Sequence, residues 1–426
     1  MERNKSRGCV GLLLFLSWFV YTAANVGRMD YSASMVAVIE QTGSSKNAAG
    51  LVASFFFFAY GAGQLVNGFL CHKYNTRFAV FGALILSAVM NVALPLCDSV
   101  TYMKYIWLAN GAVQSVLWSS LVRLQSEYLN DGDVGQSILL MSTTTAAGTF
   151  IAYGLSALFV SFVGWQTTFY VAGGILIAAA FCWLFGVGYI RKNLPRYEVK
   201  KSELPLNEKG AASKKPVYIA LAFIFVFAVA NGFIKDGVTT WMPNLLKETY
   251  ALETYFSIII TLILPLISIS GAYISKLIHK RFPNDVLLCG AFYLVSGGVL
   301  GLALWLYTKS LAAAIVVFSL VACFMAAINN IVSSSVPFRL RTLGKSGMYA
   351  GLINTFCYAG SALSSFLMGA MAESRGWDSV LILLAAVSVA AGIAAGGLAP
   401  FWHKKISPLI NEGREEKIKE EKYETV

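Results

Sequence analysis

Twelve apolar runs, each about as long as a membrane-crossing helix, dominate the sequence. A helix rises 1.5 Å per residue, so about 20 apolar residues cross a hydrocarbon core of about 30 Å. Because the bilayer core offers no partner for free backbone groups, such runs have to form helices. We therefore predict an all-α membrane protein with 12 transmembrane helices. The runs cover residues 10–38, 47–71, 78–97, 102–124, 136–162, 166–190, 216–242, 254–279, 285–307, 310–336, 344–371 and 377–402.

Positive charge gathers on one side of these runs. The N-terminus, the loops after the even-numbered runs and the C-terminal tail hold 26 Lys and Arg, whereas the opposite loops hold five. By the positive-inside rule, both termini lie in the cytoplasm of a multi-pass protein of the cell inner (plasma) membrane. The same clustering argues against a nucleic-acid partner, although the formal net charge of the chain is +11. The predicted partners are the lipid bilayer and a small anion.

One long hydrophilic connection divides the chain into two sets of six runs. The two sets share a register, because Arg28 and Lys235 are 207 residues apart and Gly68 and Gly271 are 203 apart. A parallel repeat of six helices, with the binding site between the halves, is a known transporter plan. We predict two pseudo-symmetric bundles joined by a linker. The predicted units are an N-terminal bundle (1–190), a cytoplasmic linker (191–215), a C-terminal bundle (216–402) and a charged cytoplasmic tail (403–426).

Arg28 and Lys235 are cations inside apolar runs. A buried cation in a membrane is costly, so it usually faces a wet cavity and handles a ligand. Arg28 lies 17 residues after Gly11 and Lys235 lies 18 after Val217, which places both at similar depth. Arg28 would grip an anion through its planar fork and Lys235 as a point charge. The pattern predicts a central substrate site, with an ion pair between helices as the alternative role for each cation.

Polar and aromatic side chains recur in the apolar runs around these cations. Tyr and amide groups in hydrocarbon need partners, which a cavity or a neighbouring helix supplies. For the tryptophans, plain packing is the competing interpretation. The predicted substrate-binding residues besides the two cations are Tyr21, Tyr60, Gln64, Gln114, Trp118, Asn354 and Tyr358.

Two carboxylates, Asp30 and Asp236, accompany the cations. Residues one or two apart on a helix do not face each other, so we expect neither acid to pair with its neighbouring cation. Both would instead meet polar groups on other helices or water. If either titrates in the cavity, proton coupling becomes possible. Asp30 and Asp236 are therefore candidate coupling residues, with a structural role as the alternative.

No catalytic or cofactor motif stands out in the sequence. Its seven Cys are scattered through or beside apolar runs without a C-x-x-C, and its three His lie at or beyond the ends of runs. A Gly-x4-Gly-Lys-Ser/Thr nucleotide loop is also absent. Pairs such as Gly61 and Gly63 stand in apolar helices and indicate close helix packing. We predict no metal, no cofactor and no enzymatic activity.

The stretch from Gly68 to Arg77 resembles the loop signature of the major facilitator superfamily, and its Lys73-x-Asn75-x-Arg77 ending resembles the organophosphate:phosphate antiporter branch. Gly68, Lys73 and Arg77 are its matching positions. The resemblance implies the major facilitator fold and a phosphate-ester carrier. Further segments agree: Tyr21-x6-Arg28-x2-Tyr31, Trp107-x2-Asn110-Gly111-x2-Gln114-Ser115-x2-Trp118-x4-Arg123, Gly164-Trp165, Gly237-x3-Trp241-x-Pro243-x2-Leu246-x-Glu248 and Gly351-Leu352-x-Asn354-Thr355-x2-Tyr358-x-Gly360.

Four departures from that branch bear on the substrate. The signature Asp is His72, the Lys expected after Tyr60 is Gln64, and the second binding Arg is Lys235. Where some members place a His, this chain has Ser-Thr-Thr-Thr at 142–145. Gln64 resembles the neighbouring anion:cation symporter branch, which carries carboxylates such as sugar acids.

The expected function is secondary active transport of an organic anion, a phosphate ester exchanged for phosphate, by a monomer. Two alternatives stay open: proton-coupled symport of a carboxylate or sugar acid, and a transporter-like membrane sensor of sugar phosphate. Transport by alternating access would rock the two bundles about the site at Arg28 and Lys235.

Overall fold

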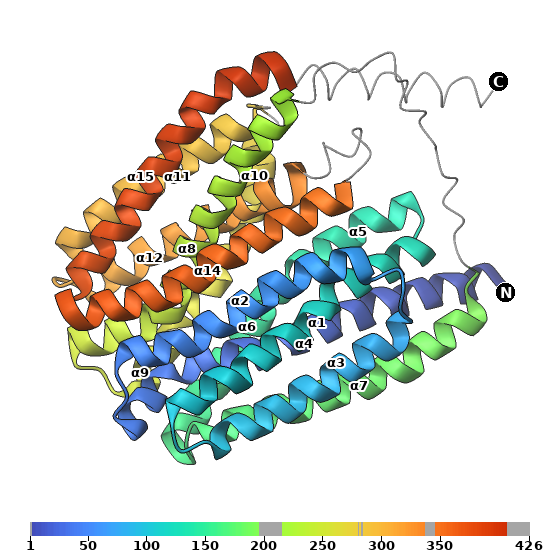
Figure 1. The fold of residues 1–426 in the computed structure, drawn as a ribbon, viewed down its shortest axis with the longest axis horizontal. Coiled ribbons are helices and arrows are strands. Elements are labelled where there is room, and N and C mark those ends of the chain that lie inside the picture. Colours follow the sequence, from blue (N-terminus) through green and yellow to red (C-terminus); the bar gives the residue numbers. More distant parts are fainter. Residues whose placement is uncertain (1, 196–214, 280, 283, 337–345, 407–426) are drawn as a thin grey trace.

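A computed structural model describes residues 2–195, 215–279, 281–282, 284–336 and 346–406. In these ranges the chain forms helices joined by turns, with no strand (Figure 1). Most of the predicted linker and tail lies outside the described residues. Their boundaries, and the ends of the two predicted bundles, therefore remain predictions.

The first half of the chain contains seven α-helices and one 3-10 turn. They are α1 (Glu2–Thr42), α2 (Lys46–Leu70), α3 (Thr76–Ala93), η1 (Leu94–Leu96), α4 (Val100–Tyr128), α5 (Asp131–Ser142), α6 (Thr144–Phe162) and α7 (Gln166–Asn193). Each of the helices α2 to α5 is preceded by a capping residue whose side chain accepts a hydrogen bond from a backbone N–H of the first turn. The caps are Ser45, Asn75, Ser99 and Asn130. Such caps stabilise a helix by about 1 kcal/mol each.

The second half follows the same plan with two π turns. Asn284 and Ser310 cap α11 and α12 in the same way as the caps of the first half. The elements are α8 (Lys215–Tyr250), α9 (Thr254–Thr261), α10 (Ile263–His279), α11 (Asp285–Leu306), α12 (Leu311–Asn330), η3 (Ile331–Ser335), α14 (Ser346–Arg375), α15 (Trp377–Phe401) and η5 (Trp402–Ile406).

Every predicted apolar run is helical where the structure describes it, and two of the runs are broken. The fifth run divides at Thr143 into α5 and α6, and the eighth divides at Leu262 into α9 and α10. Within the described ranges, ten helical segments are long and apolar enough to cross a membrane. The helices α4 and α14 are not among them, because both carry many buried polar residues that face other helices.

The helices form two groups, α1–α7 and α8–α15, with α14 beside α2 at the boundary (Figure 1). Glycines allow the tightest approaches. A Cβ added to Gly360 on α14 would collide with the carbonyl oxygen of Val229 on α8, and one added to Gly232 would collide with that of Cys357. Gly63 on α2 meets Ser115 on α4 in the same way, which confirms the expected close packing at Gly61 and Gly63.

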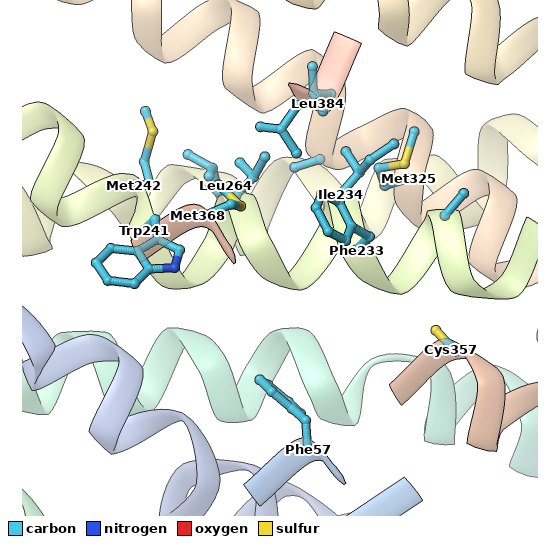
Figure 2. Packing of buried hydrophobic residues seen from close by; sticks show 14 of the residues in the cluster. Phe57, Phe233, Ile234, Trp241, Met242, Leu264, Met325, Cys357, Met368 and Leu384 are labelled. Carbon is cyan, nitrogen blue, oxygen red and sulfur yellow. The ribbon is translucent and has the colours of Figure 1, made fainter. Parts of the chain in front are cut away.

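Large apolar side chains fill the space behind this boundary. Figure 2 shows Phe233, Trp241 and Met242 along α8, with Met368 beside them and Phe57 facing them from the first half. Lipid tails are as apolar as these side chains, so contact between the helices, and not water exclusion, holds them together. This packing gives α8 the rigidity to hold a polar residue at a fixed depth.

Hydrogen bonds and ion pairs between the two groups lie at one end of the molecule and at mid-depth. At the end near residues 43–45, Lys46 Nζ lies 2.7 Å from Glu248 Oε2, which also accepts a hydrogen bond of 2.9 Å from Trp377 Nε1. Lys247 pairs with Glu40 beside them. At mid-depth, Thr355 donates to the carbonyl oxygen of Gly61 at 3.1 Å. The described residues at the other end provide no such bond between the groups, so this state is closed at the Lys46 end.

Candidate functional site

The site begins with a distortion of α1 at Gly27. This residue has φ −76° and ψ 17°, outside the helical range, and its carbonyl oxygen turns toward neighbouring helices. Asn91 on α3 donates to that oxygen at 3.2 Å, and Asn110 and Gln114 on α4 donate at 3.1 and 3.2 Å. A Cβ on Gly27 would lie 2.6 Å from Leu176 Cδ1. Three amides thus hold the kink, and a side chain at this position would have to displace the end of Leu176.

The next residue, Arg28, is buried, with 3% of its surface exposed. Its Nε and one terminal nitrogen each lie 3.4 Å from Gln114 Oε1, and the other donates to Tyr358 Oη at 3.3 Å. The guanidinium carbon lies 4.1 Å from the centre of the Tyr60 ring. Arg28 forms no ion pair with any Asp or Glu that the structure describes. A cation inside a membrane protein usually faces a cavity or a partner, which makes Arg28 the candidate for binding an anion.

Aromatic rings surround this guanidinium. Tyr21 and Tyr60 share a hydrogen bond of 3.1 Å between their hydroxyls, and the Tyr21 ring lies 5.0 Å from that of Trp118. The Tyr60 and Tyr358 rings meet edge to face at 4.6 Å. Tyr358 belongs to α14, so the ring cluster joins both halves of the chain at Arg28. The faces of such rings attract a cation.

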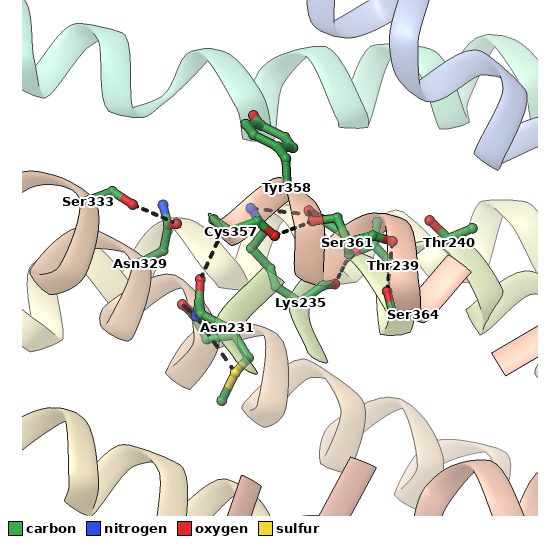
Figure 3. A network of polar contacts seen from close by, with 12 residues as sticks. Asn231, Lys235, Thr239, Thr240, Asn329, Ser333, Cys357, Tyr358, Ser361 and Ser364 are labelled. Carbon is green, nitrogen blue, oxygen red and sulfur yellow. Dashed lines mark hydrogen bonds and ion pairs between the residues drawn. The ribbon is translucent and has the colours of Figure 1, made fainter. Parts of the chain in front are cut away.

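Lys235 on α8 lies on the other side of Tyr358. Its Nζ is 3.3 Å from Oδ1 of Asp236, and Ser361 donates to Oδ2 of the same carboxylate at 2.5 Å. Figure 3 shows Lys235 beside Ser361, with Tyr358 projecting from the helix that carries Ser361. The expectation that Asp236 would not pair with its neighbour was wrong. The four-carbon Lys stem reaches back along the helix surface, which the direction of the Cβ atoms alone did not indicate.

Asp30 behaves as expected with respect to Arg28, since the two form no contact. It is fully buried, and its Oδ1 accepts a hydrogen bond of 2.7 Å from the backbone N–H of Tyr31. Its Oδ2 has no partner among the described residues. The carboxylate therefore supports the backbone one turn after the kink, on a face away from the guanidinium.

The structure brings most of the predicted binding residues together, with two exceptions. Tyr21, Tyr60, Gln114 and Tyr358 all lie against Arg28, and Trp118 contacts the Tyr21 ring at a tilted angle. Gln64 is buried but makes no hydrogen bond to another described residue. Asn354 is half-buried and likewise makes none, whereas its neighbour Thr355 does. No measurement tests the binding role of these residues, so they remain predictions.

Sequence analysis missed Gly27, Asn91, Asn110 and Phe56. Phe56 lies 5.6 Å from the guanidinium and packs against the Tyr60 ring. Asn110 precedes Gln114 by one helical turn, and this spacing within an apolar run was a usable signal. Asn91 stands alone in its run, and only the fold shows that it reaches the Gly27 carbonyl.

The loop after α2 is held without the signature acid. Arg123 on α4 donates to the carbonyl oxygens of Cys71 and Tyr74, the latter at 3.1 Å. Arg77 donates to the Leu184 carbonyl at 2.8 Å, while Lys73 is exposed and a Cβ added at Gly68 would meet open space. Hydrogen bonds from Arg123 to backbone carbonyls thus hold this loop, which has His72 where the signature has Asp.

An apolar cavity of about 380 Å³ lies between α8, α14 and α15. Val226, Phe233 and Leu367 are among its lining residues, none of which is charged. Desolvating an anion there would be unfavourable, because nothing replaces its water. The polar cluster at Arg28 fits an anion and this cavity does not.

Known transporters resemble the chain in sequence and in fold. The chain is 25% identical over 407 residues to a glycerol-3-phosphate transporter of Bacillus subtilis, covering 88% of each chain. It is 20% identical over 414 residues to the membrane sensor protein UhpC of Escherichia coli, covering 91% of each. The crystal structure of a nucleoside transporter, NupG, superposes with a TM-score of 0.70 at 13% identity, over 92% of this chain and 99% of that one.

A family model settles membership. The model for the Major Facilitator Superfamily matches residues 10–365, most of the described chain. Together with the phosphate-ester relatives, this confirms the resemblance drawn from the residues around Gly68, Gln114 and Tyr358. The chain is a multi-pass membrane transporter and not an enzyme, and in a bacterium its place is the inner membrane. It belongs to the Major Facilitator Superfamily.

Proposed function

We propose that this protein is a secondary active transporter that exchanges a phosphate ester for inorganic phosphate. The observation that carries the proposal is Arg28, buried at the meeting of both halves and without a carboxylate partner among the described residues. Three of the five guanidinium N–H groups donate to Gln114 and Tyr358, which leaves two for the oxygens of a phosphate, and the face of the cation is covered by Tyr60. The substrate of the glycerol-3-phosphate transporter relative is of the same class.

Transport proceeds in this proposal by rocking of the two helix groups about Arg28 and Tyr358. Twelve helices cross the membrane with both termini in the cytoplasm, which places the closed Lys46 end outside and opens the site inward. A chain whose seven native cysteines are replaced by serine, and which carries one added cysteine, tests this. Lys309→Cys should react with an impermeant maleimide from outside the cell, and Lys192→Cys only after permeabilisation. The reverse pattern would contradict the topology.

Obligatory exchange follows from charge. An empty site with an unpaired guanidinium is unfavourable to close away from water, whereas a site filled by an anion is closer to neutral. The protein should therefore change state readily only with cargo bound. A proton-coupled symporter would instead need an acid that titrates during transport, and Asp236 is already engaged by two partners.

Counterflow in proteoliposomes tests the exchange. Vesicles loaded with phosphate should take up labelled phosphate or glycerol 3-phosphate, and empty vesicles should take up neither. A pH gradient without internal anion should drive no uptake. Uptake into empty vesicles under that gradient would instead support the symport alternative.

A second candidate function is sensing, which the similarity to the sensor protein UhpC favours. A sensor would bind a sugar phosphate at Arg28 without moving it. Stabilisation of the purified protein by glucose 6-phosphate, together with no counterflow of any anion tested, would favour sensing over transport.

A further inference from the structure

Asp236 cancels the charge of one of the two cations at the proposed site. We infer that Asp236 sets the valence of the cargo, so that the site prefers an oxyanion headgroup with a single negative charge over a dianion. The inference rests on the proposed function, because it concerns the same site.

The geometry shows a carboxylate that is fixed and fully used. Both oxygens of Asp236 have partners, Lys235 Nζ at 3.3 Å and Ser361 Oγ at 2.5 Å, and only 6% of the residue is exposed. One oxygen thus lies against the Lys235 ammonium and the other accepts from the Ser361 hydroxyl. The Lys235 side chain keeps 25% of its surface exposed, so it faces the interior as half of a neutral pair.

The other groups that the structure describes around the two cations add no fixed charge. Tyr21, Tyr60 and Tyr358 face the guanidinium, and Tyr153 and Cys357 lie near the Lys235–Asp236 pair. Phenols and thiols are neutral near pH 7 unless a strong partner ionises them. Asp30 contacts a backbone N–H on another face of α1. One uncompensated positive charge, that of Arg28, therefore remains for the cargo.

This count separates chemically similar anions. A phosphate monoester loses its second proton with a pKa of about 6, so near neutral pH it exists as both monoanion and dianion. A sulfonate of the same carbon skeleton is a monoanion throughout. A second negative charge in a weakly solvated site meets Asp236 and no free cation, and like charges juxtaposed in this way are strongly disfavoured. The singly charged headgroup matches the site.

The test compares glycerol 3-phosphate with 2,3-dihydroxypropane-1-sulfonate at pH 7.5, where the first is mostly a dianion and the second a monoanion. Dissociation constants are measured by calorimetry on purified full-length protein. The wild type should bind the sulfonate more tightly. Asp236→Asn frees Lys235 and should shift the ratio of the two constants toward the phosphate by roughly tenfold or more. All dissociation constants are measured at the same pH, so the ratios do not reflect a change in the protonation of the protein between measurements.

Two further variants test the same inference, so that the conclusion does not depend on the correct folding of Asp236→Asn alone. Lys235→Gln leaves the acid unpaired and should move the ratio the opposite way. The double variant Lys235→Gln/Asp236→Asn restores the net charge and should return the wild-type ratio. An equal ratio in all four proteins would overturn the inference while leaving anion transport intact, whereas loss of anion binding in Arg28→Ala tests the proposed function separately.

Discussion

The guanidinium carbon of Arg28 lies 4.1 Å from the centre of the Tyr60 ring, so one face of the cation rests on an aromatic surface. A contact of this kind is worth about 0.5–2 kcal/mol, depending on solvation. We predict that Tyr60→Phe keeps the ring and lowers exchange only a few-fold, through loss of the Tyr21 hydrogen bond. Tyr60→Leu loses the ring and should raise the KM for phosphate several-fold more. Equal KM values in both variants would contradict this role of the ring.

The kink at Gly27 makes a second prediction. Gly27→Ala places a methyl group 2.6 Å from Leu176 Cδ1 and 3.1 Å from Asn91 Nδ2, both at the ends of side chains that can shift, so the expected cost is at the lower end of the about 1–3 kcal/mol typical of overpacking. The variant should show a lower Tm in detergent and slower exchange, because Arg28 follows directly. Gly174→Ala is the matched control, since a Cβ there meets open space. A Tm loss in the control equal to that in Gly27→Ala would show that the close contacts at Gly27 are not the cause of the loss.

Asp30 should tolerate loss of its charge. Its Oδ1 accepts a hydrogen bond from the backbone N–H of Tyr31, and the amide oxygen of Asn can accept the same bond. Asp30→Asn is expected to retain most of the exchange activity, whereas Asp30→Ala leaves a buried N–H with a weaker partner and should lower the Tm. Exchange assays and thermal unfolding of both variants check this. Abolished exchange in a well-folded Asp30→Asn would instead support proton coupling at Asp30.

The ion pair between Lys46 and Glu248 closes one end of the molecule. Exposed pairs contribute at most about 1 kcal/mol to stability, but this pair joins the two helix groups and can bias their opening. In a protein with a cysteine introduced between the two helix groups near Lys46, Lys46→Glu should make that cysteine react faster with a maleimide added from the Lys46 end. Adding Glu248→Lys should reverse the change. An unchanged labelling rate in the single variant would show that the pair does not bias opening.

The fold was predictable to a large extent because apolar length is a strong constraint in a membrane. The runs that became α1, α2 and α7 needed no tertiary information. The break at Thr143 was not predicted from the apolar run. The hydroxyls of Thr143 and Thr144 donate to backbone carbonyls of their own turn, and such local bonds compete with a regular helix. Twelve crossings and the cytoplasmic termini stay predictions.

The site was predicted in part. The half-repeat placed Arg28 and Lys235 at similar depth, and both lie around Tyr358 in the structure. The sequence spacing did not predict the pairing of Lys235 with Asp236. The long Lys235 side chain allows its ammonium group to reach the carboxylate of the next residue. The non-helical backbone at Gly27 depends on amides from two other helices, which no local pattern contains.

The measurement that tests the account most directly is phosphate exchange by Arg28→Ala in proteoliposomes. Loss of a charged contact to a buried anion costs about 2–5 kcal/mol, so exchange should fall at least about thirtyfold. Lys309→Ala, which removes an exposed cation far from the site, should exchange like the wild type. Wild-type exchange by a correctly inserted Arg28→Ala would contradict the account.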